Sequence, residues 1–265
     1  MSVWLDGAGL EDISPRVKIK SIEPGVPALT LKTADNAKYG GVRFLSQKEG
    51  GRTVKITFHV LEANAERRRR VLEDVTAWAL GAPGSGPGHA ARLEIADEPD
   101  KYLGVRCTAF PSLDVRRDYV EDASVTFTAF DPSWKALHPT TASLKTTAGR
   151  AGSAYLTPPG TADTAFLEFE IKSIAAGAMN TAAVTVNGRS FSFAGLALAA
   201  GGTLAVRYDG DGRLSIATLD GMSKLHCRTA QSDDDLMLYQ RKPNKVTVTT
   251  QTAAEVKLIG RGRYR

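Results

Sequence analysis

The chain has 265 residues, 42% hydrophobic and 24% charged, with a formal net charge of +5 at pH 7. These values are typical of a globular protein with room for two domains, and they exclude a disordered chain. No apolar run reaches the roughly 20 residues that a transmembrane helix needs, so we expect no membrane partner. The first residues lack the basic start and apolar middle of a signal peptide, so we expect folding in a cytoplasm.

The first half of the chain has the alternation of β-strands. A strand is predicted at residues 16–22 (RVKIKSI) and another patterned piece at 41–45. Thr53–Val60 alternates strictly between apolar and polar residues, which predicts a strand with one buried face. Further strands are predicted at 93–95, 102–110 and 125–130. The first half is therefore expected to be rich in sheet.

One amphipathic helix follows the Thr53–Val60 strand directly. Asn64 is a predicted N-cap, and Gly81 is the predicted end of the helix. The apolar residues between them recur at helical spacing, and they are Val71, Leu72, Val75, Trp78 and Ala79. A strand followed by such a helix predicts a helix that covers the apolar face of a sheet. Neither element carries a catalytic group.

Four consecutive arginines, Arg67–Arg70, lie on this helix. Successive helical residues turn by about 100°, so the four cannot share one solvent face. Helical spacing predicts ion pairs of Glu66 with Arg70, Arg69 with Glu73, and Arg70 with Asp74. A solvated face with these pairs is one interpretation. The other is a contact with a neighbouring subunit, for which Arg67 and Arg68 are the candidates.

The second half changes character after residue 133. Residues 133–159 are rich in Thr, Ser, Ala and Gly, which is typical of a crossing between domains. In the first half, the glycine-rich residues 81–89 are expected to form an exposed loop. Strands are predicted at 166–171, 184–193, 203–208, 214–219, 236–239, 245–250 and 254–260. Asn187-Gly188 and residues 209–212 (DGDG) predict two hairpin turns. This spacing favours an antiparallel β-sandwich. The predicted domains are therefore residues 1–135 and 136–265.

Candidate catalytic and metal-binding patterns are weak throughout the chain. The DGDG turn lacks the glutamate of a calcium loop, and Asp233-Asp234-Asp235 favours a solvated loop over a cation site. Cys107 and Cys227 have no local partner, so two buried thiols are favoured over a disulfide or a zinc site. We therefore predict no enzyme activity, no cofactor and no metal.

The last 25 residues are basic, with seven Lys and Arg side chains against Glu255 alone. One interpretation is that the charges protect the edge of a terminal strand or form a subunit contact. The second interpretation is a contact with nucleic acid. The shortage of aromatic residues favours the first interpretation over the second.

The order of several segments resembles the distal tail (Dit) proteins of bacteriophages with long, non-contractile tails. The segments are LDGAGLEDIS, RVKIKSI, GGRTVKITFHVLEANAERRRRVLEDVTAWAL, RLEIADEPDKYLGVRCTAF, TFTAFDPSW and SDDDLMLYQRKPNKVTVTTQTAAEVKLIGRGRY. Together they span most of the chain. The sequence departs from the family at Arg241–Asn244, where members often carry Pro-Gly before the Asn, which puts the geometry of this turn in question.

The resemblance implies a mainly β protein with a structural role. It implies an N-terminal β-sandwich or split barrel with one helix, similar to tail-tube proteins, and a galectin-like C-terminal sandwich. Six copies would form a ring at the tail tip of the virion, after assembly in the host cytoplasm. The implied partners are the major tail tube protein, the tape-measure protein and the tail-associated hub or lysin protein, with DNA passing through the lumen without specific binding.

A carbohydrate-binding module of a phage adhesion device is the alternative function. Saccharide sites usually present exposed aromatic rings, whereas the second half has no tryptophan after Trp134. Most of its aromatic residues fall in strand patterns as core. A cell-wall hydrolase is the third interpretation, and no pair of carboxylates is selected by the sequence.

Overall fold

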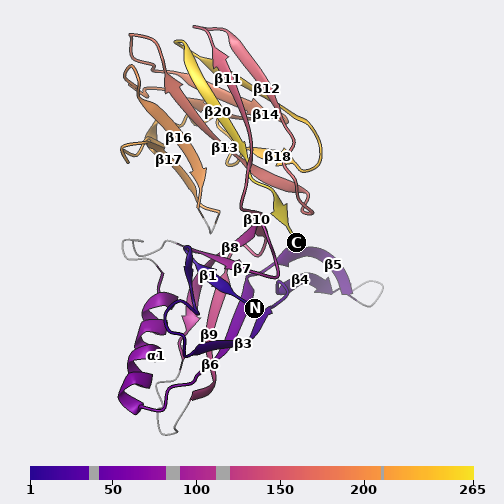
Figure 1. Cartoon of the computed structure of the whole chain (residues 1–265). Coiled ribbons are helices and arrows are strands. Elements are labelled where there is room, and N and C mark those ends of the chain that lie inside the picture. Colours follow the sequence, from indigo (N-terminus) through magenta and orange to yellow (C-terminus); the bar gives the residue numbers. More distant parts are fainter. Residues whose placement is uncertain (36–41, 82–89, 112–119, 210–211) are drawn as a thin grey trace. The chain divides into compact units, whose positions relative to one another are not determined.

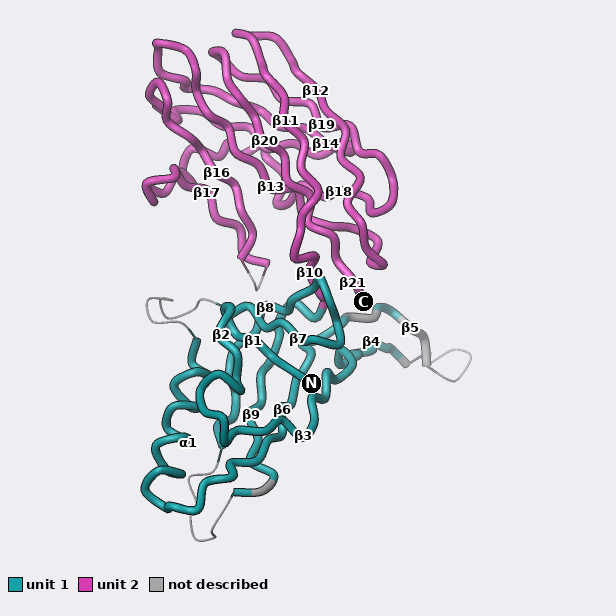
Figure 2. The backbone as a smooth tube through the Cα atoms, viewed as in Figure 1, with its two compact units in different colours: residues 1–132 teal, residues 133–265 magenta. Residues whose placement is uncertain are grey.

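The computed structural model describes residues 1–35, 42–81, 90–111, 120–209 and 212–265. The chain forms two compact units, Met1–Pro132 and Ser133–Arg265 (Figure 2). The described chain is mainly β, as predicted, and carries a single α-helix (Figure 1). The predicted loop at 81–89 lies outside the described residues, except for Gly81.

The long sheet of unit 1 is antiparallel, with the strand order β2-β1-β7-β8-β9-β6-β3. Its strands are β1 (Val3–Leu5), β2 (Ala8–Gly9), β3 (Val17–Pro24), β6 (Arg52–Val60), β7 (Ala91–Ile95), β8 (Lys101–Ala109) and β9 (Val120–Ala129). The described strands do not close into a barrel, because β2 and β3 remain at the two ends of the order. Strand β9 begins five residues before its predicted start at Val125, since Val120 pairs with Val60 although polar residues follow it.

Helix α1 (Ala65–Ala79) covers one face of this sheet, as predicted. Leu72, Val75 and Trp78 are buried on its inner side, and the Trp78 ring meets the Phe127 ring edge-on at 5.9 Å. The opposing residues of β6 are fully buried, and they are Val54, Ile56, Phe58 and Val60. Each such side chain stabilises the fold by roughly 1.5–3 kcal/mol. The core of unit 1 therefore lies between α1 and the sheet.

A separate hairpin, β4 (Leu29–Asp35) and β5 (Val42–Glu49), extends away from the long sheet in Figure 1. Among the described strands, these two pair only with each other. Only part of β5 was predicted. The whole of β4 was missed, because it follows closely on the turn residues Pro24, Gly25 and Pro27.

Unit 2 is a sandwich of two antiparallel sheets, as predicted. One sheet has the order β11-β20-β13-β16-β17, with β18 also pairing with β13, and the other has the order β12-β19-β14-β15. Their strands are β11 (Thr140–Thr146), β12 (Ala151–Leu156), β13 (Thr164–Ser173), β14 (Ala182–Val186), β15 (Arg189–Phe193), β16 (Thr203–Tyr208), β17 (Leu214–Thr218), β18 (Met237–Tyr239), β19 (Asn244–Thr250) and β20 (Ala254–Gly260). A short 3-10 helix, η1, spans Leu225–Cys227. Apolar residues of both sheets, such as Phe169 and Val248, form one core.

The predicted crossing at 133–159 is wrong, because β11 and β12 lie within it. Strand β11 pairs with β20 along its whole length, from Thr140 opposite Gly260 to Thr146 opposite Ala254. Its inward residues include Ala142, and small side chains of this kind give a weak apolar alternation in the sequence. The pairing partner lies more than 100 residues away, so local patterning could not reveal this strand.

Of the two predicted hairpin turns of unit 2, the first is present, and the strands that flank the second are paired. Asn187 and Gly188 have φ of +50° and +79°, as a two-residue turn of this kind requires, and they join β14 to β15. Strands β16 and β17 pair up to Tyr208 opposite Leu214. The tip of this second hairpin, residues 210–211, lies outside the described residues.

The basic tail folds back within unit 2. Strand β21 (Arg263–Tyr264) pairs with β10 (Trp134–Ala136). Arg261 donates from Nη1 to the Ala136 carbonyl at 3.0 Å, and the Arg263 guanidinium lies 5.3 Å from the centre of the Phe166 ring. Arg265 lies 3.6 Å from the carboxylate of Asp163. The terminal arginines thus take part in contacts of the fold itself.

Candidate functional site

The start of α1 is built as the sequence predicted. The Asn64 side chain accepts a hydrogen bond from the Arg67 backbone N–H at 3.0 Å, which caps the helix. Two of the predicted ion pairs are present, Arg69 with Glu73 at 2.9 Å and Arg70 with Glu66 at 2.5 Å. The third predicted pair is absent between these described residues, since Arg70 contacts Glu66 and not Asp74.

The two candidate interface arginines have different environments. Arg67 is exposed, whereas Arg68 is only 2% exposed. Nη1 of Arg68 donates to the carbonyls of Glu62 and Ala63 at 2.8 and 2.6 Å, where the chain enters the helix. Arg68 is four residues before Leu72 on the apolar stripe, a position that could have indicated its burial. The subunit contact stays a prediction, and Arg67 is the more accessible of the two residues.

The β4–β5 hairpin exposes large apolar side chains. Leu29, Leu31 and Leu45 are 59%, 58% and 48% exposed, and Val26 before β4 is 87% exposed. A two-stranded hairpin without a packing partner is only marginally stable in water. Exposed apolar side chains gathered on one element are typical of an interaction surface. These residues were not predicted from the sequence.

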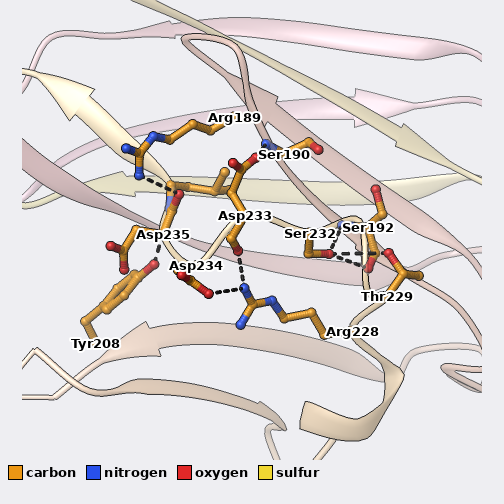
Figure 3. A network of polar contacts seen from close by, with 11 residues as sticks. Arg189, Ser190, Ser192, Tyr208, Arg228, Thr229, Ser232, Asp233, Asp234 and Asp235 are labelled. Carbon is orange, nitrogen blue, oxygen red and sulfur yellow. Dashed lines mark hydrogen bonds and ion pairs between the residues drawn. The ribbon is translucent and has the colours of Figure 1, made fainter.

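The three aspartates of 233–235 belong to a polar network on the edge of the second sheet of unit 2 (Figure 3). The Asp233 carboxylate accepts a hydrogen bond from the Ser190 N–H at 2.6 Å, and the Asp233 N–H donates to the Ser190 carbonyl at 2.9 Å. Arg228 donates to the Asp233 carbonyl and lies 3.5 Å from the Asp234 carboxylate. The solvated-loop interpretation is therefore incomplete, because Asp233 is used to hold the loop on β15.

A second contact holds the same loop against β15. Ser232 accepts a hydrogen bond from the Ser192 N–H at 2.9 Å and donates to the Ser192 carbonyl at 3.0 Å. The Thr229 N–H also donates to that carbonyl, at 2.9 Å. The loop thus satisfies backbone groups at the outer edge of β15, which would otherwise be open to another strand.

A buried asparagine, Asn244, fixes the turn where the sequence departs from the resembled family. It is 1% exposed, and its Nδ2 lies within 3.0 Å of the carbonyls of Leu156, Tyr239 and Lys242. Its Oδ1 accepts from the Tyr239 N–H at 2.7 Å and from Asn187 Nδ2 at 2.8 Å. This role could not be predicted from the sequence, because all five partners are carbonyl, amide or N–H groups placed by the fold.

The outer face of the first sheet of unit 2 carries a groove of about 800 Å³. Charged side chains from neighbouring strands line it: Lys145 of β11, Glu255 and Lys257 of β20, and Glu170 and Lys172 of β13. Lys145 pairs with Glu255 at 2.9 Å. The hydrogen bond from Lys145 lowers the pKa of the Glu255 carboxyl below its usual value, which keeps this group ionised.

The two thiols, which were predicted to be buried, have different environments. Both cysteines are free; Cys227 is buried as predicted, and Cys107 is half-buried, with burial raising the pKa of its thiol. No group of three or more His, Cys, Asp or Glu side chains that could hold a metal is present among the described residues. No helix in the described part of the chain is long and apolar enough to cross a membrane.

Comparison with known proteins finds likeness in fold alone. No family model matches the sequence, and no curated protein matches it. The Dit protein of phage SPP1, described as a paradigm of the hub adsorption apparatus in phages that infect Gram-positive bacteria, aligns over 98% of this chain and 98% of its own length. The TM-score is 0.65 at 13% sequence identity. The chain has the fold of a phage Dit protein.

Chains of the phage p2 baseplate in its activated conformation share this Dit fold. The structures with calcium and with strontium align over 92% of this chain and 90% of theirs. Their TM-scores are 0.51 and 0.55, at 8% and 7% identity. The resemblance seen in the sequence is thus confirmed at the level of the fold, which both units share with the SPP1 protein.

Proposed function

We propose that this chain is a structural distal tail protein, which forms a ring of six copies at the tip of a phage tail. The single observation that carries the proposal is the likeness to the SPP1 Dit protein over 98% of both chains. A match across both units supports a common overall role more strongly than a match to one sandwich, because single sandwiches serve many functions.

The β4–β5 hairpin supports self-association. Its exposed leucines leave apolar surface that a second copy of unit 1 would remove from water. A hairpin whose described strands pair only with each other would also gain stability from such a contact. We therefore assign the hairpin, with Arg67, to the surface between neighbouring copies.

The proposed ring joins the tail tube and tape-measure protein on one side to the tail-associated hub protein on the other. It is assembled in the host cytoplasm and resides at the tail tip of the virion. DNA crosses its lumen without specific binding. The terminal arginines are consistent with this, since Arg261, Arg263 and Arg265 make contacts within unit 2.

We propose no catalytic role for the chain. The polar clusters of the described residues serve the fold: Asp233 holds a loop on β15, and Asn244 fixes a turn. Incubation of the purified protein with peptidoglycan, followed by measurement of released reducing sugars and amino groups, should give no product. Product release that persists after further purification would contradict this part of the proposal.

Size-exclusion chromatography with light scattering, repeated over a range of concentrations, tests the ring. We expect a mass of six chains and ring-shaped particles in negative stain. A monomer at every concentration, both alone and mixed with the tail-associated hub protein, would overturn the proposal.

Saccharide binding is the second candidate function, and the groove on the outer face of unit 2 is the observation that favours it. Its volume of about 800 Å³ lies within the range of ligand-binding clefts, roughly 300–1,000 Å³. No aromatic side chain is among the described residues that line it, so any saccharide would be held mainly by polar contacts. A tail-tip protein and a saccharide-binding protein can be the same molecule, because the groove and the hairpin lie in different units.

A further inference from the structure

The groove of unit 2 gathers charges because of the strand register of its sheet. Glu255 of β20 is the partner of Lys145 on one side and of Lys172 on the other. Glu170 of β13 is the partner of Lys257, and it also forms an ion pair with Arg207 of β16. All these side chains are on the face opposite the core, because residues of one strand alternate between its two faces.

Each carboxylate that lines the groove is therefore next to two cations. Two carboxylates, Glu170 and Glu255, and three lysines, Lys145, Lys172 and Lys257, line the groove, and Arg207, which is not among the lining residues, also pairs with Glu170. The carboxylates are ordered by their pairs, and the excess positive charge remains on the groove. Charge complementarity therefore favours an anionic ligand.

The other groups of the groove favour a ligand with many hydroxyls. The hydroxyls of Ser143 and Thr203 line it, and each can both donate and accept a hydrogen bond. The carboxylates accept hydrogen bonds only, so a fitting ligand must bring donors as well as negative charge. At one end Leu219, which is 66% exposed, offers an apolar contact.

We propose that this groove binds an acidic glycan, a saccharide chain that carries carboxylate or phosphate groups. Its acidic groups contact Lys172 and Lys257, its hydroxyls donate to Glu170 and Glu255, and a C–H face of one sugar ring lies on Leu219. A DNA backbone offers phosphate acceptors without hydroxyl donors, so it leaves the two carboxylates facing negative charge. The inference deepens the saccharide-binding candidate and is independent of ring formation.

Calorimetric titration of the full-length protein with defined probes tests this inference. The probes are oligogalacturonate for the carboxylate class, a phosphorylated mannan oligosaccharide for the phosphate class, dextran oligosaccharide as the neutral control, and a short DNA duplex. We expect binding of at least one acidic glycan that weakens as salt is raised, and at least tenfold weaker binding of dextran and DNA. The two acidic probes distinguish the source of the negative charge.

Single-lysine variants locate the site. Lys172→Gln and Lys257→Gln should each weaken glycan binding about fivefold, since one exposed charge contact contributes modestly. Lys245→Gln is the matched control, because Lys245 is exposed on β19 of the other sheet. The affinity of this variant for the glycan should equal that of the wild type. Circular dichroism of each variant verifies that the fold is kept.

Three outcomes would overturn the inference: no binding of either acidic glycan at millimolar concentration, equal or tighter binding of DNA, or an equal loss in the Lys245→Gln control. A six-copy ring that binds no glycan leaves the structural role standing. A monomer that binds an acidic glycan supports the groove and rejects the ring.

Discussion

Unit 1 and unit 2 differ in how the strands at their edges are covered. In unit 2 the loop 229–235 covers the edge of β15. The segment after β17 covers the edge of β17, because the Lys224 N–H donates a hydrogen bond to the Ile216 carbonyl at 2.8 Å. In unit 1 the β4–β5 hairpin pairs only with itself among the described strands and exposes its leucines. Unit 2 therefore covers the edges of β15 and β17 from its own chain, whereas the β4–β5 hairpin of unit 1 has no other described strand beside it.

The largest expected effect is a loss of stability in unit 2. Asn244→Ala should lower the free energy of unfolding by about 3 kcal/mol, because several buried backbone groups lose their partner. Urea unfolding with circular dichroism measures the change. Asn180→Ala is the control, since Asn180 is exposed and should change the stability by less than about 0.5 kcal/mol. Equal effects of the two variants would reject the role given to Asn244.

A smaller effect is expected at the start of α1. Arg68→Ala should destabilise the protein by about 2 kcal/mol, because the carbonyls of Glu62 and Ala63 lose a charged donor in a buried position. Arg67→Ala should leave the unfolding free energy within about 0.5 kcal/mol of the wild type, since Arg67 is exposed. On our proposal, the Arg67 variant weakens self-association instead, which light scattering detects. Similar unfolding curves for both variants would contradict the distinction between them.

The smallest expected effect is a pH dependence in unit 2. Burial raises the pKa of Tyr208 to about 12, while its hydroxyl accepts a hydrogen bond from the Leu236 N–H. In the unfolded chain the phenol ionises near pH 10, so the unfolded state releases its proton first and stability falls between about pH 10 and pH 12. We expect a loss of roughly 1 kcal/mol, reduced by the partial exposure of the ring.

Tyr208→Phe should remove this part of the pH dependence. The Tyr155→Phe variant is the control, because Tyr155 is 65% exposed on β12, and it should keep the wild-type slope. Unfolding free energies measured at pH 9 and pH 11.5 give the comparison. A slope that is the same in Tyr208→Phe and in the wild type would contradict the assignment.

The sequence predicted those elements whose pattern is local. The Asn64 cap, the apolar stripe of α1 and the turn at Asn187-Gly188 each depend on residues a few positions apart, and all three are confirmed. Strand β11 was missed because its alternation depends on small residues and on pairing with β20, more than 100 residues later. Strand β4 was missed because a cluster of turn residues precedes it closely.

The candidate sites were less accessible to sequence reasoning than the fold. The positions of Lys172 and Glu255 are ordinary polar positions of two strands, and only the register of the sheet brings them together. Arg68 was chosen for a neighbouring subunit, yet it donates to carbonyls of its own chain. Its spacing from Leu72 on the apolar stripe indicated burial, but the run of four arginines favoured a solvent-exposed face or a subunit contact.

The most direct test of the contrast between the units is the paired measurement of mass and stability in a hairpin variant. In the double variant Leu31→Ser/Leu45→Ser we expect the six-copy ring to be replaced by monomer. The thermal unfolding midpoint of this monomer should stay within a few degrees of the midpoint of Arg67→Ala, measured at a dilution at which Arg67→Ala is also monomeric. Leu80→Ser, which changes a leucine that is 68% exposed after α1, should keep the ring. A double variant that still forms rings at wild-type concentration would contradict the claim that unit 1 associates through its hairpin.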